Sequence, residues 1–297
     1  SWDEVLVKSI PMARQAGNAE EFSEIVRGLI DDAGGDSFDD FPLLLPGSFT
    51  FDPFFDWIRD QSYFTKTTQY LLYRIMANLQ APSSLTTQDS IGMIQASREE
   101  YYKENLYPDE AHRLLCLFRF WNIIQYFFPY RKLMDRPWDE TLPDMIPRFM
   151  EAENELDYAL AVRELTARID DSHAVLYSPI LDQQFWGLYY PPFRSRTVED
   201  RIVITELLDT GIDVIRVGDM ICEVDGDSVD EIRARIFKYL RGSNPAVKER
   251  ELNAYFCRGK SRAMTLLIER GGTKKAVDLQ RIDQDEYQLL VQESEKG

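Results

Sequence analysis

The chain has 297 residues, 44% of them hydrophobic, which is enough for roughly two domains that each bury a core. Its formal net charge of −17 repels nucleic-acid phosphates and anionic lipid, so we expect no nucleic-acid partner. No apolar run approaches the roughly 20 residues that span a bilayer, and the cysteines are too few and too widely spaced for a disulfide framework or a zinc site. The composition therefore predicts a folded protein without membrane span, metal or cofactor.

Residues 1–104 are predicted to form a helical region. Trp2 to Ile30 carries apolar residues at helical spacing around a Gly17-Asn18 turn, which predicts two short helices. Asp36 to Asp56 is rich in Phe, Pro and Asp and predicts an irregular connection, and Thr67 to Leu79 predicts a third helix. The pattern between that helix and residue 107 is weak and predicts no element.

Residues 105–178 are predicted to form a second helical region. Its clearest helix runs from Asp109 to Phe128, with Asp109 as cap and Pro129 as terminator. His112 lies off the apolar stripe of this helix, so we expect a surface or capping role for it. Two further helices are predicted at 138–150 and 155–169, and they lead into Asp170-Asp171-Ser172-His173.

The two helical regions contain an internal repeat. Trp138-Asp139-Glu140 matches Trp2-Asp3-Glu4 at an offset of 136 residues (138 − 2), and the similarity continues through both helix pairs. After one slipped residue, Asp171-Ser172-His173 aligns with Asp36-Ser37-Phe38, so only the second copy ends in histidine. A scaffold that carries its imidazole once suggests that His173 has a role beyond folding. A hydrogen bond at the helix end or a packed core position remains an alternative.

Residues 185–283 change to a β-type period. Strands are predicted at 201–207, 264–269 and 275–280. Helices are predicted after Asp227 or Ser228 and from Asn244-Pro245. Residues 284–297 are predicted to be a polar tail. The fold class is therefore α+β and multidomain, with an all-α N-terminal region followed by a small β-barrel or sandwich with two helices.

Several constellations that carry chemistry are incomplete. Arg258-Gly259-Lys260-Ser261 ends like a phosphate-binding loop, but Ala254 stands where such a loop has its first glycine. Asp225-Gly226-Asp227 opens like a calcium loop, yet Asp230 occupies its required glycine position, so a turn and a helix cap are expected there. No Gly-x-Ser-x-Gly elbow occurs, and the chain offers no convincing nucleophile.

Four segments together resemble one family. Val214 to Gly226 is similar to the signature of bacterial PDZ domains. Phe120 to Tyr130, Ile169 to Ala174 and Tyr189 to Phe193, in this order ahead of such a signature, resemble tail-specific (C-terminal-processing) and tricorn-type serine peptidases. The resemblance covers about residues 105–283.

This resemblance implies an architecture and a role for His173. The family places a helical region and a PDZ domain ahead of a catalytic domain that bears the serine, and the latter is expected beyond residue 297. Tricorn-type members take their general base from a histidine ahead of the PDZ domain, which His173 matches, whereas other members use a Ser-Lys pair. The resemblance also implies a periplasmic, cell-envelope or extracellular location. The fragment alone is expected to be inactive.

The PDZ resemblance further implies that the partners are peptide or protein C-termini. Such a peptide would add to the strand that carries Ile202 and Ile204, with its carboxylate at the preceding loop, Tyr189, Tyr190 and Phe193. Pro191 and Pro192 donate no N–H there, which lowers the number of carboxylate donors. A non-catalytic PDZ adaptor that only binds peptides is the alternative function.

Overall fold

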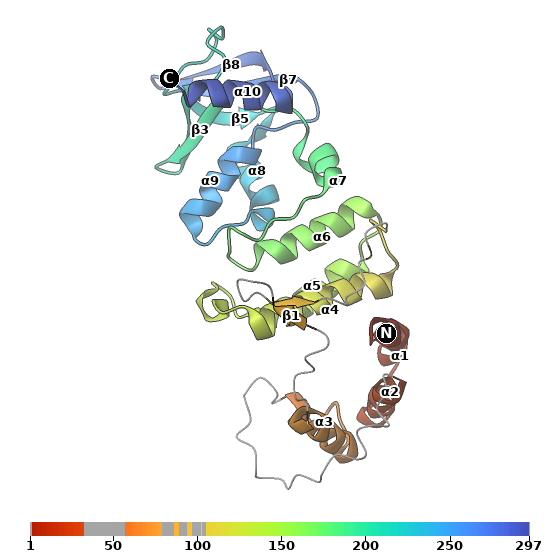
Figure 1. Cartoon of the computed structure of the whole chain (residues 1–297). Helices are drawn as coiled ribbons and strands as arrows, with labels where there is room; N and C mark the ends of the chain where they lie inside the picture. Colours follow the sequence, from red (N-terminus) through yellow and green to blue (C-terminus); the bar gives the residue numbers. More distant parts are fainter. Residues whose placement is uncertain are drawn as a thin grey trace. The chain divides into compact units, whose positions relative to one another are not determined.

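The computed structural model describes residues 2–32, 57–78, 86–88, 94–96, 102 and 105–296. It divides into two compact units, residues 1–115 and 116–297 (Figure 1). The division falls within helix α4 (Glu110–Phe127), so residues 116–178 of the second helical region and the β-rich region belong to one unit. None of the helices in these described stretches is long and apolar enough to cross a membrane.

The first unit begins with the predicted helix pair, α1 (Trp2–Ala13) and α2 (Ala19–Asp32). Asn18 starts α2, because its side-chain oxygen accepts the backbone N–H of Glu21 at 2.9 Å. Helix α3 (Lys66–Asn78) matches the third predicted helix, and β1 (Thr86–Gln88) pairs antiparallel with β2 (Ile94–Ala96). The connection predicted at 36–56 lies outside the described residues.

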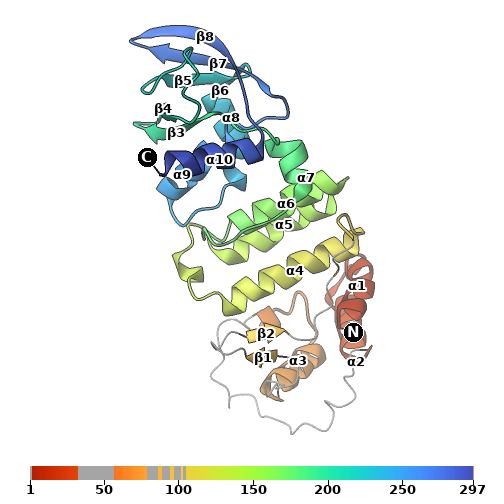
Figure 2. The same ribbon diagram turned by 45° about the horizontal axis from the view of Figure 1, so that its top comes forward.

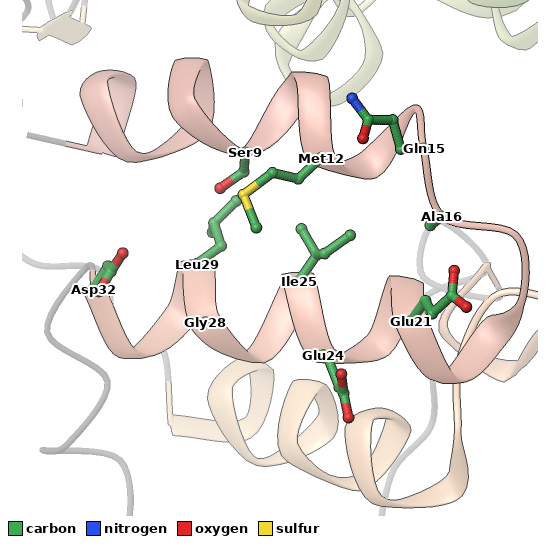
Figure 3. Close-up of a pocket in the computed structure, with 10 residues that line it drawn as sticks. All are labelled: Ser9, Met12, Gln15, Ala16, Glu21, Glu24, Ile25, Gly28, Leu29 and Asp32. Atoms are coloured by element: carbon green, nitrogen blue, oxygen red, sulfur yellow. The ribbon is translucent and has the colours of Figure 1, made fainter.

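A gap of about 490 Å³ lies between α1 and α2. Ser9 and Met12 of α1 face Ile25 and Leu29 of α2 across it (Figure 3). Gly28 adds no side chain to this face, and nothing lies within 4 Å of where its Cβ would be. Side chains of α1 and α2 therefore do not fill the space between the two helices.

The second unit contains the second predicted helix pair. A short 3-10 turn η3 (Arg131–Leu133) follows α4, and a second one, η4 (Trp138–Glu140), leads into α5 (Thr141–Met150) and α6 (Glu155–Ala167). The indole N–H of Trp121 donates to the carbonyl of Trp138 at 3.2 Å, and that of Trp138 donates to the carbonyl of Trp121 at 3.1 Å. This reciprocal pair ties α4 to the start of the helix pair.

The two helix pairs start 136 residues apart: α1 and η4 begin at residues 2 and 138, and α2 and α6 begin at residues 19 and 155. Met145 and Phe149 are fully buried in the second pair, where Phe149 meets Tyr158 edge-on at 5.8 Å. Ser9 and Ala13 occupy the matching positions of the first pair. Of these two, Ser9 lines the gap between α1 and α2, and its small side chain leaves part of it open.

The β-rich part is one antiparallel six-stranded sheet in the order β3-β4-β5-β7-β8, with β6 paired to β5 (Figure 2). Its strands are β3 (Phe193–Val198), β4 (Arg201–Leu207), β5 (Met220–Val224), β6 (Asp227–Ser228), β7 (Ala263–Arg270) and β8 (Thr273–Gln280). Buried residues alternate along the strands, as Met264, Leu266 and Ile268 show on β7. Because every second side chain is buried, one face of the sheet packs against the core.

Helices cover that face. Ser228 caps α8 (Val229–Ile236) through a capping box with Glu231, and Asn244 caps α9 (Pro245–Tyr255), as the sequence predicts. The short turn η6 (Phe237–Tyr239) continues α8. The core lies between these helices and the sheet, and short segments before the sheet, α7 (Pro179–Leu181) and the π-turn η5 (Asp182–Trp186), add Leu181 and Trp186 to it. The mixture of helices and an antiparallel sheet confirms the α+β class.

Two elements differ from expectation. Residues 193–198 form strand β3, joined to β4 by a two-residue turn in which Glu199 and Asp200 both have positive φ, at 48° and 62°. Residues 284–297 are not a plain tail, because Asp283 caps helix α10 (Gln284–Ser294). Figure 2 shows α10 beside β3 and α9, and Arg194 binds Glu295 at 3.3 Å there. No residue of α10 is buried, and Tyr287, Ser294 and Glu295 connect this end of the chain to the β-rich part.

Candidate functional site

His173 lies in a tight turn after α6. The Asp171 carboxylate accepts the backbone N–H of His173 at 2.9 Å and lies 2.8 Å from ring atom Nδ1. The hydrogen bond from the backbone N–H of His173 lowers the pKa of Asp171 most, and the ring contact lowers it further. Burial acts in the opposite direction, but the pKa stays below its usual value. An ionised carboxylate only accepts, so Nδ1 carries the proton in this contact. Nε2 is therefore left to exchange a proton with another group.

The turn is anchored at Asp170, which has a positive φ of 54°. Its carboxylate binds Nζ of Lys248, from α9, at 2.6 Å and accepts the backbone N–H of Asp135 at 3.0 Å. Both Asp170 and Lys248 are largely shielded from water, with side chains 13% and 18% exposed. The turn that presents His173 is thus fixed to the body of the second unit from two directions.

The imidazole itself points into solvent, with 94% of its side chain exposed. Among the described residues its only recorded side-chain partner is Asp171, and no serine hydroxyl hydrogen-bonds to it. A carboxylate on Nδ1 and a free Nε2 are the two features that a general base needs. The arrangement can accept a proton from a hydroxyl brought to it.

His112 is an internal comparison, because it has the same local contact. Its Nδ1 lies 2.9 Å from Asp109, which also accepts its backbone N–H at 3.0 Å and thereby caps α4. The His112 side chain is 35% exposed and is covered by the ring of Tyr102 at 5.5 Å. The predicted capping role of this segment is confirmed. The two histidines thus share the same Asp contact and differ in exposure, 94% for the His173 side chain and 35% for that of His112.

The predicted carboxylate-binding loop has its backbone donors already in use. The N–H of Tyr189 donates to Gly259 at 3.1 Å, and that of Tyr190 donates to Ile282 at 2.8 Å. Pro191 and Pro192 have no N–H. The Tyr190 ring lies between Arg258, 4.4 Å away, and the stacked ring of Tyr287 at 4.8 Å. This loop joins the sheet to the C-terminal segment, and its first two backbone N–H groups are not free for a ligand.

Strand β4, where the sequence predicts peptide addition, is internal to the sheet. It pairs with β3 on one side and with β5 on the other, and Ile202 and Ile204 are buried in the core together with Phe193. An internal strand cannot accept a further strand where it is already paired. The free edge on this side of the sheet belongs to β3.

Strand β3, α9 and α10 enclose a groove of about 480 Å³, hereafter the β3–α9 groove. Its lining includes three arginines and one carboxylate, Arg194, Arg196, Arg250 and Glu206. Asn253 of α9 spans to β3, where it hydrogen-bonds Ser195 at 3.1 Å and Thr197 at 2.9 Å. These contacts fix the distance between helix and strand. Short charged strands give little local signal, so the sequence did not reveal the groove.

The Gly-Asp and Asp-Gly motifs of residues 214–226 have structural roles. Asp219 is buried and accepts two hydrogen bonds from Arg270, at 2.7 and 2.6 Å, and one from the backbone N–H of Arg216 at 2.8 Å. Asp225 and Gly226 both have positive φ, at 54° and 93°, and make the turn between β5 and β6. The turn and cap predicted there are confirmed.

Gly259 explains the phosphate-loop-like segment. Gly259 packs directly against the guanidinium of buried Arg281. A side chain would not fit here, because a Cβ on residue 259 would lie 2.6 Å from Cζ of Arg281. Arg281 donates to the carbonyls of Cys257 and Ala263 at 2.7 and 2.8 Å and pairs with Asp225 at 2.5 Å. The backbone of residues 257–263 therefore binds an internal arginine. Within the described residues no cluster of metal-binding side chains occurs.

Comparisons with known proteins identify no family. No protein-family model matches the chain, and no curated protein matches it. Among solved structures it is similar to that of mature CPAF, a chlamydial serine protease, at 16% identity and a TM-score of 0.43, over 58% of this chain and 34% of that one. A serine-to-alanine mutant of CPAF gives a TM-score of 0.41 at 16% identity, over 59% and 34%. The chain thus spans about a third of the proteins it matches, and similarity at this level carries no argument about activity.

Proposed function

We propose that this chain is the N-terminal and peptide-binding part of a serine endopeptidase similar to tail-specific and tricorn-type peptidases. In this proposal the β-rich region acts as a PDZ domain that binds the C-terminal end of a protein substrate. His173 acts as general base for a serine on a further domain. A periplasmic, cell-envelope or extracellular location belongs to the same proposal.

The observation that carries the proposal is the His173 turn. Its imidazole is held on Nδ1 by Asp171, and its Nε2 is exposed to solvent. In the proposed reaction Nε2 takes the proton of the serine hydroxyl as its oxygen bonds to the peptide carbonyl carbon, and returns it to the leaving amine as the C–N bond breaks. Asp171 stabilises the imidazolium formed between these steps.

The PDZ assignment is supported by the position of an antiparallel sheet with two helices directly after the His173 segment. Strand β3 offers a free edge, and α9 lies alongside it. Extended peptides bind proteins by adding a strand to such an edge. The alternative, an adaptor that binds peptides without cleaving them, would use the same edge but would not need His173.

The test uses the full-length gene product and a peptide substrate. His173→Ala is expected to lower kcat/KM by on the order of 10³ or more, because a serine loses its base. Asp171→Asn should lower it as well, since the amide can hold the wrong tautomer. His112→Ala removes a histidine with the same Asp contact and serves as the matched control, with activity unchanged. Near-normal turnover by the His173→Ala variant would discard the catalytic role and favour the adaptor.

A further inference from the structure

The β3–α9 groove concentrates positive charge in a strongly acidic protein. Three of its lining residues are arginines and one is a glutamate, whereas the chain as a whole has a net charge of −17. Arg194 and Glu206 pair with each other at 3.4 Å, and each has a further partner in α10 or just beyond it, Glu295 for Arg194 and Ser294 for Glu206. These two charges are therefore satisfied internally.

Arg196 and Arg250 differ from that pair. Both are exposed, and neither has a hydrogen-bond or ion-pair partner among the residues that the structure describes. The two acidic residues that flank Arg250 in the chain are engaged elsewhere, because Glu249 binds Arg233 and Glu251 binds Arg241. The groove thus holds two guanidinium groups available to an anionic ligand.

The groove also has room and a fixed shape. Asn253 holds α9 on β3 through Ser195 and Thr197, which sets its width before any ligand binds. Phe193, Ala254 and Tyr287 add apolar surface beside the arginines. Because β3 is an edge strand, the backbone groups on its outer side have no strand partner.

We propose that this groove binds peptide C-termini that end in Asp or Glu. The peptide backbone lies along β3, and the terminal and side-chain carboxylates bind Arg196 and Arg250. Guanidinium groups replace the backbone N–H donors of Tyr189 and Tyr190, which bond within the protein instead. Two available cations match the two carboxylates of a terminal acidic residue. This inference rests on the proposed binding of protein tails and assigns their chemistry.

The test is titration of residues 1–297 with fluorescein-labelled decapeptides, followed by anisotropy. One peptide ends in Glu as a free acid, a second is its C-terminal amide, and a third ends in Lys. We expect the free acid to bind about tenfold more tightly than either of the others, which is the scale of one charge-assisted hydrogen bond. Raising the salt concentration should weaken the free acid most.

Variants locate the binding site. Arg196→Gln and Arg250→Gln should each weaken binding of the free acid by about tenfold. Arg201→Gln removes an exposed arginine of β4 that does not line the groove, and it should leave the affinity unchanged. A Lys-ended peptide that binds as tightly as the Glu-ended acid, or binding that is unaffected by both groove variants, would overturn the inference. Tail recognition would still stand in either case if the free acid binds more tightly than its amide. Absence of binding by any peptide would overturn both, while loss of activity in the His173→Ala enzyme concerns only catalysis.

Discussion

At the scale of single residues, Asp219 shows how a short motif fixes a fold. Its carboxylate is 2% exposed and closes the segment before β5 by binding both Arg270 on β7 and the backbone of Arg216. Burial alone would raise the pKa of Asp219, but the hydrogen bonds from Arg270 and Arg216 outweigh it, and the pKa lies below its usual value. The ionised form is therefore the one that stabilises the folded state.

We predict that Asp219→Asn lowers the free energy of unfolding by about 2 kcal/mol at pH 7, since Arg270 is itself partly exposed and screened. A lowered pKa means that the stabilisation is present above the unfolded pKa of about 3.9 and is lost as the pH falls through the folded value. The difference between wild type and variant should shrink below about pH 4. Urea unfolding at several pH values measures it.

Asp200→Asn is the matched control for that series. Asp200 is exposed in the turn between β3 and β4, and asparagine tolerates its positive φ equally well. Its substitution should change stability little at any pH. A wild-type advantage over Asp219→Asn that stays constant from pH 7 to pH 3 would show that the carboxylate charge does not contribute.

How far the sequence predicts a site depends on whether the contacts are local. In the His173 turn the imidazole contacts Asp171, which is only two residues away. The sequence Asp171-Ser172-His173 was therefore enough to single out His173. The β3–α9 groove could not, because Arg196 and Arg250 meet only after β3 and α9 pack together. The free edge was likewise set by strand order, which places β4 inside the sheet. Local patterns carry no information about strand order in a sheet.

At the scale of elements, strongly periodic segments were predicted well. The helices α4, α5 and α6 and the strands β4, β7 and β8 lie within a few residues of their predicted positions. Strand β3 was not predicted because its turn, Glu199-Asp200, has no glycine to signal positive φ. Helix α10 did carry a signal: Asp283 as cap, followed by Tyr287, Leu290 and Val291 at helical spacing.

The comparison of the two helix pairs gives a prediction about packing. Ser9 lines the gap between α1 and α2, at the position that Met145 fills in the second pair (Figure 3). Ser9→Met should bury apolar surface against Ile25 and Leu29 and raise the free energy of unfolding of the first unit by about 1 kcal/mol. Thermal unfolding followed by circular dichroism measures the gain. Lys8→Met places the same side chain on an exposed position of α1 and should give no such increase.

At the scale of the second unit, a buried arginine joins the helix pair to the helices that cover the sheet. Arg163 of α6 is 3% exposed, donates to the carbonyl of Tyr239 at 2.8 Å and lies 3.3 Å from Glu251 of α9. Glu251 also binds Arg241 at 2.7 Å. The rings of Trp186 and Tyr255 meet at a tilt beside it, and the Arg163 guanidinium lies 6.0 Å from the centre of each ring. The segment that carries His173 follows α6 directly in the chain.

We predict that Arg163→Ala lowers the free energy of unfolding of the second unit by about 2 kcal/mol, because the Tyr239 carbonyl loses its donor and Glu251 keeps only Arg241. It should also uncouple the helix pair from the β-rich part. Tryptophan fluorescence and far-ultraviolet circular dichroism should then report different urea transitions, whereas the two probes should coincide in wild type. Arg168→Ala is the control, because Arg168 also lies at the end of α6 but binds only Asp144 and Glu164 within the helix pair. It should cost about 1 kcal/mol or less and leave the two probes coincident. Equal effects of both substitutions would show that the polar contacts of Arg163 do not join the helix pair to the β-rich part.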